Sequence, residues 1–300
     1  MRRAVPLRQI MSAVHCNLSE IYDGTQSAVK NMQMSLLRFQ LKKGCMMKSK
    51  LLTTLILAAC AVPGIALADE ASPFSANVGL TTDYIFRGIS QTSAEPALQG
   101  GIDYAHGSGF YAGIWGSNVS WISDFNPGVS SSLELDTYFG FRNALDSGFS
   151  YDVGYIRYNY PASNYPAGAT KADTDEVYAA VGYKWISAKY SYGLGKFLTV
   201  PGASGTSYFE VNASVPLGDS GFTLGAHIGR QDYRGDAADA LAMAGSDPTY
   251  SDYKLSVSRD FGGYVAALAA SNTNASGFYT TPAGKDLGRS TVTLSVTHAF

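Results

Sequence analysis

Acidic and basic side chains recur at every second position in several segments of this sequence, a spacing that could line a water-filled passage. The segment from 133 to 142 reads LELDTYFGFR, so an extended chain would place Glu134, Asp136 and Arg142 on one face and Leu133 and Phe139 on the other. Carboxylates that face lipid are costly, whereas carboxylates in a wet interior stay solvated. The alternation therefore predicts strands with a polar inner face and an apolar outer face.

The same period of two predicts an inner face for charged residues in most of the other strands. The pore-lining candidates on this face are Asp83, Arg87, Asp103, Glu134, Asp136, Arg142, Asp152, Glu176, Lys184, Lys189, Glu210, His227, Asp252 and Lys254. Such a mixture of acids and bases can line a channel, or it can close into ion-paired packing that blocks one. Eight-stranded barrels are filled by side chains and 16-stranded barrels hold an aqueous channel, so a barrel whose number of strands lies between these should leave a narrow pore.

Catalysis would need more than charged side chains. A barrel lipid hydrolase requires a serine and a histidine within hydrogen-bond reach. Of the histidines after position 68, His106 falls in a predicted turn, His298 falls at the terminal rim, and only His227 falls on the inner face. No serine stands in a recognisable acyl-hydrolase motif, and all three cysteines precede Ala68. We therefore expect no enzyme activity, no catalytic residues, no cofactor and no metal site, and a lipid hydrolase is the weakest alternative.

The last residues, Arg289 to Phe300, show the kind of element that must position these side chains. Their sequence, RSTVTLSVTHAF, alternates strictly, ends on an aromatic, and has the length of a tilted membrane-spanning strand, about 9 to 11 residues. No run of about 18 apolar residues occurs, which argues against a membrane-spanning helix. The first strand is expected from Phe74 to Phe86, with Tyr84 and Phe86 among the aromatics at strand ends.

Repetition of this pattern predicts twelve strands whose connections alternate between short and mostly longer. The short connections lie near 105–109, 143–148, 186–187, 216–221 and 260–263, and the others lie at 91–96, 119–132, 161–174, 198–206, 234–249 and 273–288. Single-chain outer-membrane barrels alternate their loops in this order. The predicted fold class is all-β: a single-chain transmembrane antiparallel β-barrel of 12 strands, with short periplasmic turns and longer extracellular loops.

The N-terminal part predicts export. Residues 46–68, MMKSKLLTTLILAACAVPGIALA, have a basic start, an apolar core and small residues before Asp69, as a cleavable signal peptide does. Residues 1–45 then fit an over-extended start rather than a domain, and 69–300 form the barrel in the bacterial outer membrane. A lipoprotein processing box at Leu57–Cys60 is the rival interpretation.

The charge balance indicates the partners. Of 22 Lys+Arg nine precede Asp69, and of 24 Asp+Glu two do, so the exported part carries 13 minus 22, or −9, and nucleic acid is not an expected partner. The predicted external loops and their flanks hold three bases against nine acids, namely Lys171, Arg234 and Lys285 against Glu95, Asp124, Asp173, Asp175, Asp232, Asp236, Asp239, Asp247 and Asp286. A negatively charged mouth concentrates cations, so a cation preference is expected.

Three basic residues break the rule that charges face inward. Arg157, Lys196 and Arg230 share the parity of apolar neighbours, each at the external end of a strand. A cation at mid-bilayer costs about 2 to 4 kcal/mol but about 0 to 1 at an interface, which places them at a rim where lipopolysaccharide phosphates could bind them. The alternative is a bulge that shifts parity and turns these side chains to water.

Several stretches resemble the TorF-family porins of proteobacteria, and together they cover essentially all of 69–300. They are NVGLTTDYIFRGISQT (77–92), GFYAGIWGSNVSW (109–121), LELDTYFGF (133–141), DVGYIRYNYP (152–161) and EVYAAVGYKWISAKYSY (176–192). The resemblance implies an exported, channel-like outer-membrane protein and brings no catalytic residues. The expected function is passive diffusion of small hydrophilic solutes, with outer-membrane lipid around the barrel. A structural or adhesive barrel without transport is the alternative.

Overall fold

The computed structural model describes residues 72–161, 164–167, 169–275 and 277–300. The predictions for residues 1–45 and for the signal peptide at 46–68 lie outside this part of the chain. Within it, no helix is both long and apolar enough to cross a membrane.

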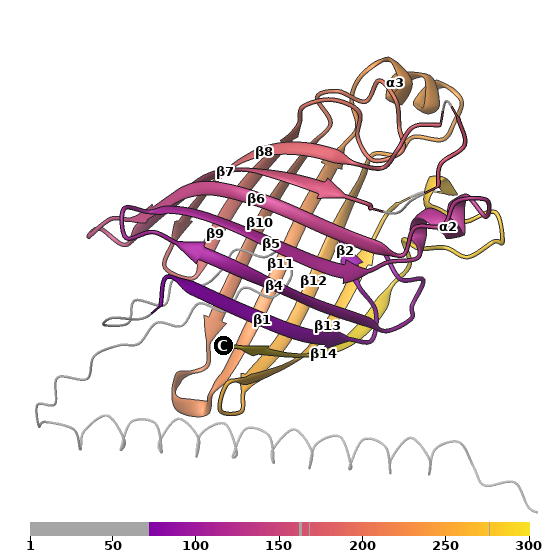
Figure 1. Ribbon diagram of the computed structural model, residues 1–300. Coiled ribbons are helices and arrows are strands. Elements are labelled where there is room, and N and C mark those ends of the chain that lie inside the picture. Colours follow the sequence, from indigo (N-terminus) through magenta and orange to yellow (C-terminus); the bar gives the residue numbers. More distant parts are fainter. Residues whose placement is uncertain (1–71, 162–163, 168, 276) are drawn as a thin grey trace, which may run out of the picture. The chain divides into compact units, whose positions relative to one another are not determined.

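Twelve antiparallel strands of the described chain close into a barrel, so the predicted fold is confirmed (Figure 1). The barrel strands are β1 Phe74–Thr81, β4 Ala97–Ala105, β5 Phe110–Asn118, β6 Leu133–Ala144, β7 Phe149–Asn159, β8 Thr174–Tyr183, β9 Ile186–Gly193, β10 Ser207–Pro216, β11 Phe222–Asp232, β12 Tyr250–Asp260, β13 Tyr264–Thr273 and β14 Thr291–Ala299. Each pairs with its sequence neighbours in the barrel, and β1 closes the ring on β14, with Leu80 opposite Val296. Closure leaves the barrel without an unpaired edge.

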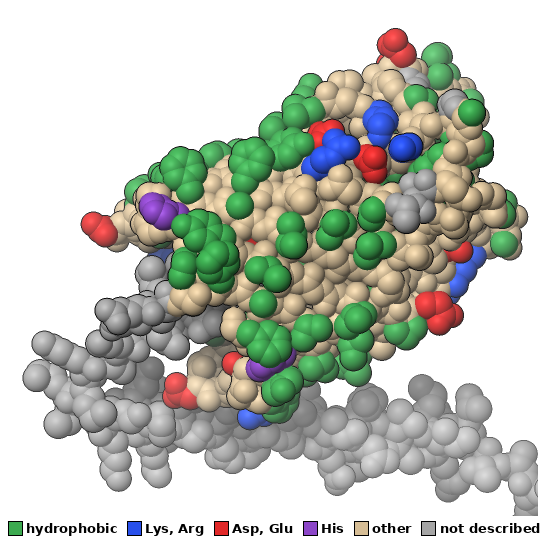
Figure 2. All heavy atoms as spheres, viewed as in Figure 1, with side chains coloured by type: hydrophobic (Ala, Val, Ile, Leu, Met, Phe, Trp, Pro, Cys, Tyr) green, Lys and Arg blue, Asp and Glu red, His purple; other side chains and the backbone are tan. Residues whose placement is uncertain are grey.

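The strand period of two sorts side chains across the barrel wall as the sequence predicts. Large apolar residues such as Leu255 and Val292 point outward and are 67% and 68% exposed, whereas Glu134 and Glu176 point inward and are buried. Figure 2 shows apolar side chains spread over the face of the barrel that it displays. An apolar exterior of this extent is unusual for a protein surrounded by water and suits a lipid environment.

The connections differ sharply between the two ends of the barrel. At the end that we call the turn end, neighbouring strands are joined by short turns, of which Lys184–Trp185 is the tightest. At the opposite end, the loop end, the connections are longer and carry α2 (Trp121–Phe125), α3 (Asp236–Met243) and the 3-10 turn η2 (Gly277–Tyr279); η1 (Gly218–Ser220) belongs to a turn (Figure 1). The predicted alternation of short and long connections is confirmed.

The first connection departs from the expectation of a strand that runs to Phe86. β1 ends at Thr81, and residues 82–96, here called the inward hairpin, turn into the barrel and form β2 (Ile85–Phe86) and β3 (Ile89–Ser90). The prediction that Tyr84 and Phe86 lie at the end of the first strand is therefore wrong. The Tyr84 hydroxyl donates to Glu134 of β6 inside the barrel. Alternation along the sequence continues unchanged through the bend, so it could not reveal where the strand stops.

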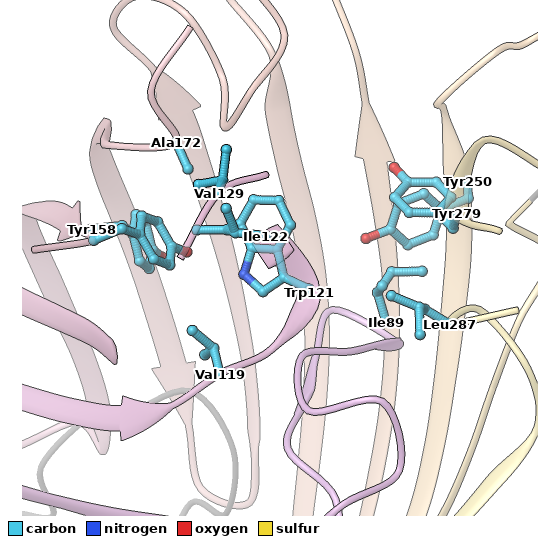
Figure 3. Close-up of a cluster of buried hydrophobic side chains, with 11 residues drawn as sticks. Ile89, Val119, Trp121, Ile122, Val129, Tyr158, Ala172, Tyr250, Tyr279 and Leu287 are labelled. Atoms are coloured by element: carbon cyan, nitrogen blue, oxygen red, sulfur yellow. The ribbon is translucent and has the colours of Figure 1, made fainter. Parts of the chain in front are cut away.

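The longer loops pack together over the loop end. Trp121 and Ile122 of α2, Ile89 of the inward hairpin, and Tyr279 and Leu287 of the last loop belong to one buried hydrophobic cluster (Figure 3). A second cluster joins the loop after β9 to the loop after β11 through Phe197 and Tyr233, whose rings meet edge to face. Because each cluster joins buried side chains from two or more loops, the loop end is covered by a folded cap.

Candidate functional site

Arg87, at the tip of the inward hairpin, is the charged residue around which the interior of the loop end is arranged. Its two terminal nitrogens donate to the two carboxylate oxygens of Glu176 on β8, at 2.9 and 2.8 Å. One of them also donates to the side-chain oxygen of Gln231 on β11, at 2.9 Å. Since β8 and β11 lie far from β1 around the barrel, the hairpin reaches across the lumen.

Aromatic rings complete the surroundings of Arg87. Its guanidinium carbon lies 4.4 Å from the ring centre of Tyr208, 4.8 Å from Phe86 and 5.9 Å from Phe197. Cations are attracted to ring faces at these distances, more strongly where water is excluded. Arg87 and Glu176 have only 3% and 1% of their side-chain surface exposed, so their ion pair is desolvated.

The hairpin geometry explains how an arginine reaches this position. Phe86 and Ile89 pair across a two-residue turn in which Arg87 and Gly88 both have positive φ, +46° and +78°. Two positive φ angles define the tight turn whose twist matches a β-hairpin. A β-carbon on Gly88 would lie 2.5 Å from the β-carbon of Asp252 on β12, so the turn abuts the barrel wall.

The base of the hairpin is held by hydrogen bonds within itself and to the cap. Asp83 accepts from the hydroxyls of Ser90 and Thr92, at 2.7 and 3.0 Å. Burial raises the pKa of Asp83, and these hydrogen bonds oppose part of that rise. The backbone carbonyl of Gln91 accepts from the amides of Ser120 and Trp121 at the start of α2. The hairpin and the cap are therefore one connected unit.

Glu134 and Asp136 on β6 form a second acidic group next to the hairpin. Glu134 accepts hydrogen bonds from the hydroxyls of Tyr84 and Tyr160, both at 2.7 Å. Asp136 is buried, and one of its carboxylate oxygens has no hydrogen-bond partner. We call Glu134, Asp136, Glu176, Tyr208, Gln231 and Asp252, together with Arg87, the upper lumen.

Nearer the turn end, tyrosines donate hydrogen bonds to carboxylates of the wall. Tyr111 donates to Asp152 and Tyr138 donates to Asp103, each at 2.6 Å. The ring of Tyr138 lies over Gly113 on the neighbouring strand, where a β-carbon would come within 2.6 Å of the ring. The absence of a side chain at this glycine lets the ring lie flat against the wall, which keeps the lumen wider than an upright ring would.

His227 on β11 belongs to a hydrogen-bonded network rather than to a nucleophilic pair. Its ring nitrogens lie 2.7 Å from Asn212 and 2.9 Å from Asp252, and the Tyr208 hydroxyl lies 3.0 Å away. None of these partners is a serine, and Tyr208 itself donates to Asp252 at 2.8 Å. The arrangement suits a polar lining residue and offers no activated nucleophile.

Most predicted lining residues lie inside the barrel, and one does not. Those inside are Asp83, Arg87, Asp103, Glu134, Asp136, Arg142, Asp152, Glu176, Lys189, Glu210, His227, Asp252 and Lys254. Lys184 is exposed in the two-residue turn between β8 and β9, so the prediction that it faces the lumen is wrong. The turn begins two residues earlier than the pattern indicates, because a tight turn leaves no gap in the alternation. Four bases and eight acids give the inner set a formal charge of −4, with His227 left out of the count.

We call the partly exposed Arg142, Lys189, Asn212 and Lys254 the lower lumen. Lys189 lies 4.0 Å from Glu210 and stacks on the ring of Tyr178, and Arg142 stacks on the ring of Tyr111. These cations, unlike Arg87, keep contact with water. In the part of the chain that the structure describes, no group of three or more His, Asp or Glu side chains could hold a metal ion.

Arg157, Lys196 and Arg230 lie at the loop end, and the strand register is regular at Arg157 and Arg230. Arg157 pairs with Asp175 at 2.9 Å, and Arg230 pairs with Asp232 at 3.3 Å. The Lys196 ammonium donates to the backbone carbonyls of Lys171 and Asp173. Burial lowers the pKa of Lys196. The side chains meet acids and carbonyls of the rim, which the sequence pattern did not indicate.

The sequence also gives no sign of Tyr208, Phe197 and Gln231 as partners of Arg87. Aromatic residues occur on both faces of the predicted strands and in the loops, and a neutral amide does not stand out in a search for charged residues. The bend after Thr81 brings the hairpin tip to these side chains. A signal for the bend could be sought in Arg87–Gly88, where a glycine permits a tight turn.

A family model described as "Bacterial protein of unknown function (Gcw_chp)" matches residues 66–300, and the chain is a member of that family. No curated protein matches the chain. Among solved structures, the KdgM porin in complex with disordered oligogalacturonate is similar with a TM-score of 0.44 and 8% identity, over 76% of this chain and 98% of that one. The NanC porin gives 0.43 and 8%, over 76% and 98%. Pseudomonas aeruginosa OccD3 (OpdP) gives 0.37 and 12%, over 78% and 66%.

Proposed function

We propose that this member of the Gcw_chp family is a porin-like channel of the outer membrane, through which small hydrophilic solutes diffuse passively. The observation that carries the proposal is the sorting of side chains across a closed barrel, apolar outside and charged inside. In a bilayer such a barrel satisfies its backbone hydrogen bonds internally and exposes only apolar groups to lipid. The resemblance of the sequence to the TorF-family porins supports this function.

The channel favours cations. The described inner set carries −4, and the acids Glu134, Asp136, Glu176 and Asp252 gather in the upper lumen, where Arg87 is the opposing base. Charge of one sign along a narrow passage attracts ions of the opposite sign and repels like ions.

The exported form begins at Asp69, after removal of the signal peptide at 46–68, and residues 1–45 are an over-extended start. Mass spectrometry of the protein extracted from outer membranes should find an N-terminus at Asp69. Peptides from 1–45 on the membrane-embedded protein would contradict this processing.

A structural or adhesive barrel without transport is the second candidate, and the inward hairpin is the observation that favours it. The hairpin and the cap leave Glu176, Gln231 and Tyr208 almost fully buried, so the loop end is closed in this conformation. The channel proposal therefore requires that the hairpin restricts conduction without abolishing it.

Planar-bilayer conductance separates the two candidates. We would compare the wild-type chain with a variant in which residues 84–91 are replaced by a glycine-serine segment of equal length. The control is Gly262→Ala in a turn, where a β-carbon meets no atom within 4 Å. The channel predicts measurable conductance for the wild type, unchanged in the control and several times larger without the hairpin. Absence of conductance in all three folded barrels would establish the structural alternative.

Arg157, Lys196 and Arg230 contribute to binding of lipopolysaccharide at the loop-end rim. Arg157 and Arg230 side chains are 40% and 56% exposed despite their acidic partners, so each retains surface for a phosphate. Arginine can bind a phosphate through two parallel hydrogen bonds, and lysine meets it as a point charge.

A further inference from the structure

Part of the surroundings of Arg87 comes from the barrel wall rather than from the hairpin. Glu176 on β8, Gln231 on β11 and Tyr208 on β10 supply a carboxylate, an amide oxygen and a ring face. Glu176 lies 89 positions and Gln231 lies 144 positions after Arg87 in the sequence. These wall residues therefore bind a guanidinium group that belongs to a distant part of the same chain.

The chemistry of this wall is that of a guanidinium site. Two parallel hydrogen bonds to one carboxylate match the planar fork of a guanidinium and no other common cation as well. The amide of Gln231 is held in place because its nitrogen donates to the Ser207 carbonyl at 3.0 Å. Tyr158 donates to Glu176 at 3.3 Å. These two wall contacts do not involve Arg87, and each holds one of the acceptor side chains.

The contacts of Arg87 in this site leave one of its side-chain nitrogens without a hydrogen bond. Its Nε is buried and has no hydrogen-bond partner. Its backbone has φ +46°, in the left-handed region that favours glycine. By contrast, Ile89 and Gln91 below the tip pack and bond into the cap. The hairpin base is thus anchored by contacts that do not involve the Arg87 side chain.

We propose that Glu176, Gln231 and Tyr208 form a binding site for the guanidinium group of a solute, which Arg87 occupies when no solute is bound. The proposal rests on the channel function, because the solute reaches the site through the lumen. When an internal group occupies a site, the apparent affinity for a competing ligand falls in proportion to the fraction of time for which the site is free. Arg87 therefore closes the site, and solutes that carry a guanidinium group displace it.

The test uses guanidinium chloride, at millimolar concentration and constant ionic strength, on full-length barrels in planar bilayers. Arg87→Ala empties the site, and Arg87→Ala with Glu176→Gln empties it and removes the carboxylate. Arg142→Ala is the matched control, because it removes one lower-lumen arginine and leaves Arg87 in place. Arg87→Gln is a second variant that also frees the carboxylate if the alanine variant fails to fold.

Guanidinium should block the Arg87→Ala channel at a concentration about tenfold or more below that needed for the wild type, the control and the double variant, because charged hydrogen bonds add to affinity. Equal sensitivity of the single and double variants would overturn the proposal. A second readout does not need conduction: guanidinium should raise the unfolding temperature of Arg87→Ala in detergent relative to the double variant. If no barrel conducts, the channel function fails, and this shift alone decides whether the site exists.

Discussion

The upper and lower lumen both hold basic side chains, but in different surroundings. In the upper lumen, Arg87 and Glu176 are shielded from water and bound to each other through two hydrogen bonds. In the lower lumen, Lys189 retains 19% of its side-chain exposure and lies 4.0 Å from Glu210. The difference arises because a hairpin and a folded cap enter one end of the barrel, whereas only short turns border the other. Closure is therefore a property of one end.

The largest contrast should appear when one partner is removed from an ion pair in each region. Glu176→Ala leaves Arg87 buried without its carboxylate, which should lower the free energy of unfolding by about 3 to 5 kcal/mol. Glu210 keeps Asn212 and His227 nearby, so Lys189→Ala should cost about 0 to 1 kcal/mol, as for a solvated pair. Urea titration of barrels folded into lipid vesicles measures both. Equal losses would contradict the distinction between the regions.

A glycine pair tests whether the hairpin tip is packed against the wall. Gly88 and Gly262 have nearly equal φ, +78° and +76°, but only a β-carbon at Gly88 would collide, with Asp252. Gly88→Ala should therefore lower stability by about 1 to 3 kcal/mol more than Gly262→Ala, because overpacking adds to the shared backbone strain. The same urea titration provides the comparison. Identical losses at the two sites would show that the tip is not pressed against β12.

Reversal of a lower-lumen charge should alter selectivity without altering closure. Lys189→Glu changes the inner charge from −4 to −6, so the reversal potential under a potassium chloride gradient should move toward the potassium limit. The shift should be small, because residues in contact with water are screened by salt. Lys184→Glu is the matched control, since Lys184 lies in an exposed turn. An equal shift in the control would assign selectivity to the turn end rather than the lumen wall.

The smallest effect is expected at the loop-end rim. Replacing Arg157, Lys196 and Arg230 with glutamine should reduce the lipopolysaccharide that co-purifies with the barrel, with conductance unchanged. The reduction should be partial, because Asp175 and Asp232 already occupy part of the hydrogen-bonding capacity of the two arginines. Phosphate analysis of the purified protein measures the bound lipid. Unchanged lipid retention would indicate that these side chains serve only the rim.

The sequence predicts the barrel wall well and its contents poorly, for a physical reason. Alternation is a local property of each strand, so Glu134 and Asp136 are assigned to the inside without knowledge of any other strand. The inward course of 82–96 depends on partners such as Glu176 and Gln231 that are distant in sequence. The predicted positions of Lys184 and Phe86 are wrong because each residue continues an alternating pattern past the point where the strand ends.

The reversal potential of the wild-type barrel tests the central claim most directly, namely that the acidic interior makes this protein a cation-favouring channel. The measurement uses a planar bilayer with a potassium chloride gradient at low ionic strength, where screening is weakest. The predicted potential has the sign of the potassium equilibrium potential and declines in magnitude as salt rises on both sides. A potential with the sign of chloride would contradict the claim.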